Sequence, residues 1–173
     1  MNALKKLVVL LIIAAICGLG ALIDYFISLS YTIDFVSVER LVNEGDEDLV
    51  DVNGNKIPLN WGVADGSTKV RFKIQLTRNG KPISGHTLYV KTNRNVLERT
   101  VTDENGMVVV DYRCYRANGN SHVDPIILTV RDENNSVFVF VPRKAEYTLN
   151  MAQIKFAEGS GMTTDDIFYD IEE

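Results

Sequence analysis

Few residues in this chain have the chemistry of a catalytic site. The sequence contains two histidines, His86 and His122, and two cysteines, of which Cys17 lies in an apolar run and Cys114 in the polar remainder. His122 follows Cys114 by eight residues, so a thiol activated by an imidazole is conceivable. Nucleophilic catalysis also needs an orienting group and an oxyanion-binding loop, and no motif here supplies them. We therefore expect a buried Cys114, solvent-facing histidines, no catalytic residues and a chain that is not an enzyme.

Oxygen-bearing side chains raise the question of a calcium site. Asp51–Asn55 (DVNGN) has them at alternate positions, as the start of an EF-hand loop does. The sixth position of such a loop needs glycine and the twelfth glutamate, but Lys56 and Gly62 stand there. A hairpin turn at the central Asn-Gly pair explains the segment better. The sequence predicts no metal site and no cofactor, although Asp103-Glu104 and Asp132-Glu133 could hold calcium weakly if they met at one end of the fold.

The elements that would position such residues are short strands. Lys69–Thr77 alternates apolar and polar residues with a period of two, which predicts a strand with one covered and one solvent-exposed face. Ile33–Leu41 alternates in the same way. Further strand-like runs are Thr87–Thr92, Arg99–Val101, Met107–Tyr112, Ile126–Arg131, Val137–Val141 and Glu146–Phe156. Seven or eight short strands separated by turn residues are typical of two packed sheets, so we expect an all-β, antiparallel sandwich.

An apolar segment precedes these strands. Two lysines come before the unbroken run Leu7–Ile23, whose seventeen residues would rise about 25 Å as a helix, slightly less than a hydrocarbon core of roughly 30 Å. Continuing the helix through Tyr25–Tyr31 supplies the missing length. Because basic residues stay on the cytoplasmic side, we expect a retained transmembrane anchor with the rest of the chain outside. A cleaved signal peptide is the alternative, since Gly18 and Gly20 are small residues suited to cleavage.

Composition limits the partners. The formal net charge is −5, with 18 basic and 23 acidic residues, and nucleic acids bind clustered lysine and arginine, so no nucleic-acid partner is expected. No motif indicates a small-molecule substrate. The roughly 140 residues after the apolar run are enough for one domain with its own core.

Three groups of turn residues punctuate the stretch from Asp65 to Val130. They are Ala64-Asp65-Gly66-Ser67, Asn79-Gly80-Lys81-Pro82-Ile83-Ser84-Gly85 and Thr102-Asp103-Glu104-Asn105-Gly106, each next to a predicted strand. This layout resembles the bacterial immunoglobulin-like repeats of the invasin and intimin type. The resemblance implies an immunoglobulin-like sandwich that mediates contacts, with positive φ at Gly80 and Gly106. The chain departs from those repeats in having room for one copy, and in bulkier residues at His86 and Tyr89.

Two further features indicate contact with a partner. Trp61, the single tryptophan, follows an acidic loop and is either core at one end of the sandwich or an exposed aromatic anchor. Near the C-terminus, Gly159-Ser160-Gly161 predicts a flexible break, and Met162–Glu173 combines five acidic residues with no basic one. Four large apolar residues lie among these acids: Ile167, Phe168, Tyr169 and Ile171. We expect these four and Trp61 to bind a partner; a last strand packed on the domain is the alternative for the tail.

These patterns predict a single-pass protein of the cell membrane in three parts. Residues 1–31 form a cytoplasmic stub and anchor, 32–157 an immunoglobulin-like β-sandwich outside the cytoplasm, and 158–173 an acidic-aromatic tail. The expected role is contact with other envelope or assembly proteins. One alternative is a phage or virion structural component whose apolar N-terminus is buried in a membrane or assembly. Another is a secreted hydrolase, which the scarcity of histidine disfavours.

Overall fold

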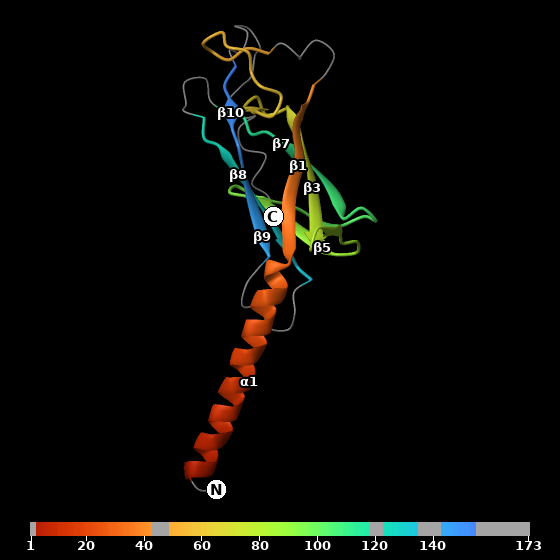
Figure 1. Cartoon of the computed structure of the whole chain (residues 1–173). Helices are drawn as coiled ribbons and strands as arrows, with labels where there is room; N and C mark the ends of the chain where they lie inside the picture. The colour runs from red at the N-terminus through yellow and green to blue at the C-terminus, as the bar shows by residue number, and fades with distance from the viewer. Residues whose placement is uncertain (1–2, 43–48, 118–122, 135–142, 155–173) are drawn as a thin grey trace.

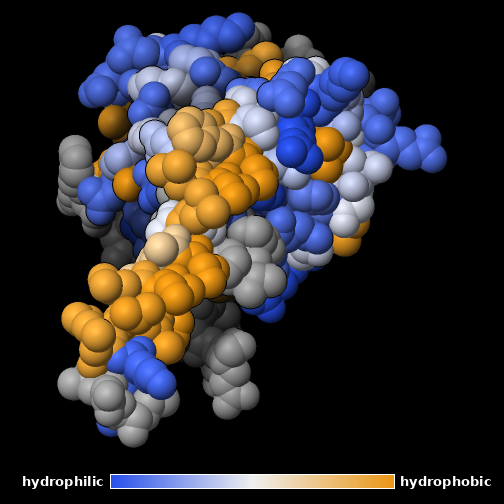
Figure 2. Space-filling model, turned by 60° about the horizontal axis from the view of Figure 1, so that its bottom comes forward, coloured by the Kyte–Doolittle hydropathy of each residue, from blue (hydrophilic) through white to orange (hydrophobic). Residues whose placement is uncertain are grey.

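A single apolar helix opens the fold. The computed structural model describes residues 3–42, 49–117, 123–134 and 143–154. Helix α1 (Ala3–Leu29) includes the span Leu4–Leu29, whose mean hydropathy of 2.7 and length suffice to cross a membrane. The helix projects away from the sheets (Figure 1). Apolar side chains cover the surface of the helix that is visible in Figure 2. A membrane anchor and a signal sequence share this length and composition.

The helix passes almost directly into the first strand. Only Ser30 separates α1 from β1 (Tyr31–Leu41), and the two follow one another along one line in Figure 1. The backbone N–H of Ser30 donates to the Ile27 carbonyl at 3.0 Å, and its hydroxyl donates to the same oxygen at 2.6 Å. These bonds satisfy a carbonyl that the end of a helix otherwise leaves without a partner. The sandwich is therefore joined to α1 without a linker.

Two antiparallel sheets form the body. In the first, β3 (Lys69–Arg78) lies between β1 and β7 (Met107–Arg113), and the short β4 (Lys81–Pro82) pairs with the end of β3. The second has the order β6–β5–β8–β9, comprising β6 (Val96–Val101), β5 (Thr87–Thr92), β8 (Ile126–Asp132) and β9 (Lys144–Leu149). A separate parallel pair joins β2 (Gly62–Val63) to β10 (Met151–Ala152).

The inner faces of the two sheets make one core. The alternation predicted for β3 is confirmed, because its four apolar residues are fully buried: Val70, Phe72, Ile74 and Leu76. The ring of Phe72 meets that of Tyr147 on β9 at a centroid distance of 5.9 Å, so the sheets face one another across this layer. Burying a large apolar side chain contributes about 1.5–3 kcal/mol, so these four side chains contribute substantially to stability.

The turn glycines behave as expected. Gly80 and Gly106 have φ of +74° and +68°. A Cβ on Gly106 would lie 2.5 Å from the Leu76 carbonyl oxygen, so both its conformation and the close approach of β3 exclude a side chain.

Some predicted elements have different bounds. The run Glu146–Phe156 is not one strand, because Asn150 separates β9 from β10, which leaves the second sheet to pair with β2. A turn forms at Gly54, with φ of +86°, but a single bridge between Val50 and Lys56 flanks it instead of two hairpin strands. The predicted strand Val137–Val141 lies outside the described residues.

Candidate functional site

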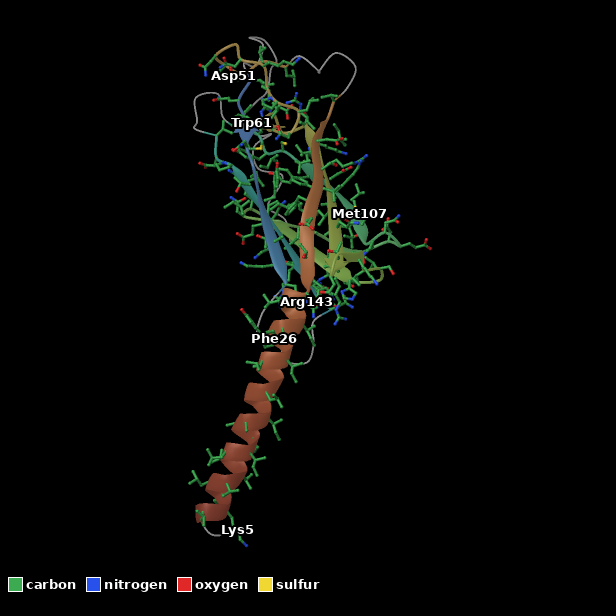
Figure 3. The ribbon with its side chains drawn as sticks, viewed as in Figure 1. Lys5, Phe26, Asp51, Trp61, Met107 and Arg143 are labelled. Carbon is green, nitrogen blue, oxygen red and sulfur yellow. The ribbon has the colours of Figure 1, made fainter. Side chains whose placement is uncertain are left out.

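The end of the sandwich farthest from α1 carries Trp61. Because β1 has eleven residues, this end stands about 35 Å from the helix, and Figure 3 shows Trp61 and Asp51 there. Trp61 is half-buried against a small second cluster formed by Ile57, Val63 and Ala152. The β2–β10 pair supports this cluster. The structure thus gives Trp61 a packed side and an exposed remainder.

Exposed apolar side chains accompany Trp61. We call this set the distal surface: Leu41, Val42, Val50, Leu59 and Trp61. Leu59 is 53% exposed and Val50 is 49% exposed. The loop that carries Leu59 is fastened to β1, because the Arg40 N–H donates to the Leu59 carbonyl at 2.7 Å and the buried Arg40 guanidinium lies 3.4 Å from the Pro58 carbonyl. A held loop with protruding apolar side chains suits binding of another protein.

A buried charge cluster lies at the opposite end, where the sandwich meets α1. We call it the junction cluster: Tyr31, His86, Asp132 and Arg143. Asp132 is fully buried; its carboxylate accepts from Arg143 Nη1 at 2.9 Å and lies 3.1 Å from His86 Nδ1. The Arg143 guanidinium stands 3.7 Å from the centre of the Tyr31 ring. Figure 3 places Arg143 at the top of the helix. The cluster therefore connects the end of β8 and the residue before β9 to the first residue of β1.

This cluster corrects the expectation that His86 faces solvent. Its side chain is 19% exposed, it contacts Asp132, and its ring stacks on Tyr31 at 5.9 Å. An aspartate–histidine contact also occurs in catalytic triads, where the second ring nitrogen meets a nucleophile. Within the part of the chain that the structure describes, no hydrogen bond reaches His86 Nε2. The contact joins the residue before β5 to the end of β8, beside Tyr31. His122 lies outside the described residues.

Cys114 is buried, as predicted. It is 2% exposed, and burial raises the pKa of its thiol to about 12. An activated thiol needs the opposite environment, one that lowers the pKa. Its sulfur lies beside Gly62. His122, the histidine considered as its partner, lies outside the described residues, so that pairing stays untested.

In two of the acidic turns, backbone N–H groups of the same turn donate hydrogen bonds to the aspartate carboxylate. Asp51 accepts from the N–H groups of Asn55 and Asn53 at 2.9 and 2.8 Å, and these bonds, that from Asn55 foremost, hold the pKa of its carboxyl below the ordinary value. Asp103 accepts from the N–H groups of Asn105 and Met107, both at 2.8 Å. Asp132 does not join Asp103 in an ion site, because Arg143 and His86 occupy its carboxylate. Among the described residues, no group of three or more metal-ligating side chains gathers.

Sequence reasoning missed the junction cluster, although a signal was present. The buried face of β8 comprises Ile126, Leu128 and Val130, and Asp132 continues the same period of two. The glutamate and two asparagines that follow Asp132 favour a turn there, which hides this signal. An acid in phase with a buried face predicts a buried ion pair, since an isolated charge there would be very costly.

The tail residues predicted to bind a partner, Ile167, Phe168, Tyr169 and Ile171, lie outside the described residues. Their role and that of Trp61 stay predictions. Comparison with known protein families, characterised proteins and solved structures finds no match to this chain.

Proposed function

We propose that this chain is a membrane-anchored, non-enzymatic contact protein that presents an immunoglobulin-like domain outside the cytoplasm. The observation that carries this proposal is the one-residue junction between an apolar helix and the first strand of a β-sandwich. A connection of one residue restricts how far the distal surface can move or tilt relative to the helix. A diffusing enzyme has no need of such a connection, whereas a protein that must present a surface to a partner benefits from it.

The charges and aromatic residues of α1 support this orientation. Lys5 lies at one end of the apolar helix, as Figure 3 shows, and Tyr25 and Phe26 are exposed near the other. Basic residues favour the cytoplasmic side, and aromatic side chains favour the headgroup level. Leu7–Ile23 would then occupy the hydrocarbon, with the junction cluster just above the headgroups.

The strand order supports an immunoglobulin-like fold. If the seven longer strands are lettered A to G along the chain, the sheets read A-B-E and D-C-F-G. The constant-type immunoglobulin domain differs from this only in that strand D lies beside E. Such sandwiches carry binding surfaces at their ends, in agreement with the position of the distal surface.

Recovery of partners from native membranes tests the proposal. The tagged full chain is extracted in mild detergent and compared with Leu59→Asp, which places a charge on the distal surface, and Val109→Asp, which does so on the outer face of β7. Val109 is 50% exposed, so the two changes are matched in exposure. We expect Leu59→Asp alone to lose a co-purifying protein. Equal recovery with both variants would contradict a contact role for the distal surface, and purification with particles would favour a virion component.

A further inference from the structure

The outer face of the second sheet is basic, although the chain as a whole is acidic. Arg99, Tyr89, Arg131 and Lys144 stand directly opposite one another on β6, β5, β8 and β9. Neighbouring strands are about 4.8 Å apart, so this row places three cations and a tyrosine across roughly 14 Å. Lys91, two residues beyond Tyr89, points to the same face. We call the five residues the basic face.

With nothing bound over it, this row of like charges destabilises the sandwich. Arg131 and Lys144 are directly opposite, and like charges in that position are destabilising. Lys144 is partly compensated by Glu146 at 3.2 Å and Arg99 by Glu133 at 3.1 Å. Within the described part of the chain, Arg131 and Lys91 form no ion pair, and both are exposed. An acidic segment bound over the row would remove the repulsion.

Apolar and aromatic groups lie among these cations. The Arg99 guanidinium is 5.1 Å from the centre of the Tyr89 ring. Outward positions of the same strands carry Ile127, 40% exposed, and Val101, 58% exposed. A surface that mixes cations with apolar side chains fits a segment that mixes carboxylates with aromatic residues, because rings bind both apolar groups and guanidinium ions.

The C-terminal sequence is such a segment, and the described chain that leads to it ends at the distal end of the sandwich, where Ile154 packs against the same cluster as Trp61. Asp165–Glu173 has five acidic residues, no basic one, and Ile167, Phe168, Tyr169 and Ile171. The edge strand β9 leads into β10, and the described chain ends at Ile154, two residues later. Residues 155–164 number ten, and ten residues span at most about 33–36 Å when extended. A six-residue strand such as β9 is about 20 Å long, so the extended segment can reach along the sheet from its distal end toward the row.

We propose that Asp165–Glu173 docks on the basic face of its own chain, with its carboxylates near Lys91 and Arg131 and with Phe168 and Tyr169 against the exposed apolar groups. Because only ten residues join the tail to the described chain, the tail has an effective concentration in the millimolar range, which favours its own sheet over a second copy. The tail then reaches an outside partner only in competition with this sheet. That consequence rests on the proposed contact function, whereas the docking does not.

Peptide binding to the full chain in mild detergent tests the docking. The probe is a fluorescein-labelled peptide of residues 162–173, measured by fluorescence anisotropy. We expect a chain truncated after Ala157 to bind it about tenfold or more tightly than the intact chain, whose own tail competes. Adding Lys91→Glu and Arg131→Glu to the truncated chain should abolish binding, and rising salt should weaken it. The matched control, Lys69→Glu with Lys73→Glu on the outer face of β3, should leave binding unchanged.

No binding by the truncated chain, equal binding by the intact chain, or insensitivity to the reversal at Lys91 and Arg131 would each overturn the proposal. If truncation prevents folding, carbodiimide cross-linking of the intact chain replaces the peptide assay. It should join carboxylates of residues 165–173 to Lys91 or Lys144 within the monomer. Cross-links found only between copies, or none to these lysines, would overturn docking in cis, and in neither case would the test of the distal surface be affected.

Discussion

At the scale of single residues, the buried pair Asp132–Arg143 determines how the sandwich begins. Asp132 is fully buried and Arg143 is 8% exposed, so both charges have lost their water. The attraction between two hydrogen-bonded ions offsets the cost of removing both from water, whereas a single buried ion has no such compensation. The Tyr31 ring adds a cation–π contact to the guanidinium. Position 31 is the first of β1, so this contact couples the core of the second sheet to the start of the first.

Replacing Arg143 should therefore be far more harmful than replacing its neighbour. Arg143→Leu leaves the Asp132 carboxylate buried without its cation, and we expect a loss of about 3–5 kcal/mol in the free energy of unfolding. Lys144→Leu removes an exposed ion pair and should cost about 1 kcal/mol or less. Urea unfolding of the full chain in detergent measures both. Equal midpoints for the two variants would show that the pair is not buried as described.

The thiol of Cys114 should be inert in the folded chain. Because burial raises its pKa to about 12, only about one thiol in ten thousand would be ionised at pH 8, and the thiolate is the reactive form. We expect no alkylation by iodoacetamide at Cys114 in native protein and complete alkylation after urea treatment. Peptide mass spectrometry separates this site from Cys17. Rapid labelling of Cys114 without denaturant would contradict its burial.

At the scale of elements, alternation was the most informative signal. The period of two in β1 and β3 predicted both strands to within two residues, because a covered face requires apolar residues at every second position. The split of the last predicted run at Asn150 could not be read in this way. β10 pairs with β2, about ninety residues earlier, and such non-local pairing leaves no local pattern. The distal surface depends on the same pairing, so only Trp61 pointed to it in advance.

The two faces of β3 should respond very differently to truncation. Phe72 is fully buried and touches both Phe35 and Tyr147, whereas its neighbour Lys73 is exposed. We expect Phe72→Ala to lower the free energy of unfolding by about 3–5 kcal/mol and Lys73→Ala to change it little. Chemical unfolding of the full chain in detergent is the measurement. Small and equal effects would mean that the sheets do not share this core.

At the scale of the whole molecule, the proposed function rests on the order of its parts along one axis. α1 is at one end, the junction cluster is in the middle, and the distal surface lies at the far end of an eleven-residue strand. Residue patterns in the sequence predicted the helix and the β-sandwich, because both depend on local periodicity. The phase of Asp132 in β8 signals a buried ion pair, but these patterns could not predict its partners or the basic face, since both arise only where distant parts of the chain come together.

Retention of α1 is the central claim, and the intact mass of the chain from the membrane fraction tests it most directly. A one-residue junction can position the sandwich only if the helix stays attached. We expect mass spectrometry of detergent-extracted protein to give the mass of the chain with α1 present. A mature species that begins near Ala21 would contradict the account, because cleavage there would separate the sandwich from most of the apolar run and leave a secreted domain.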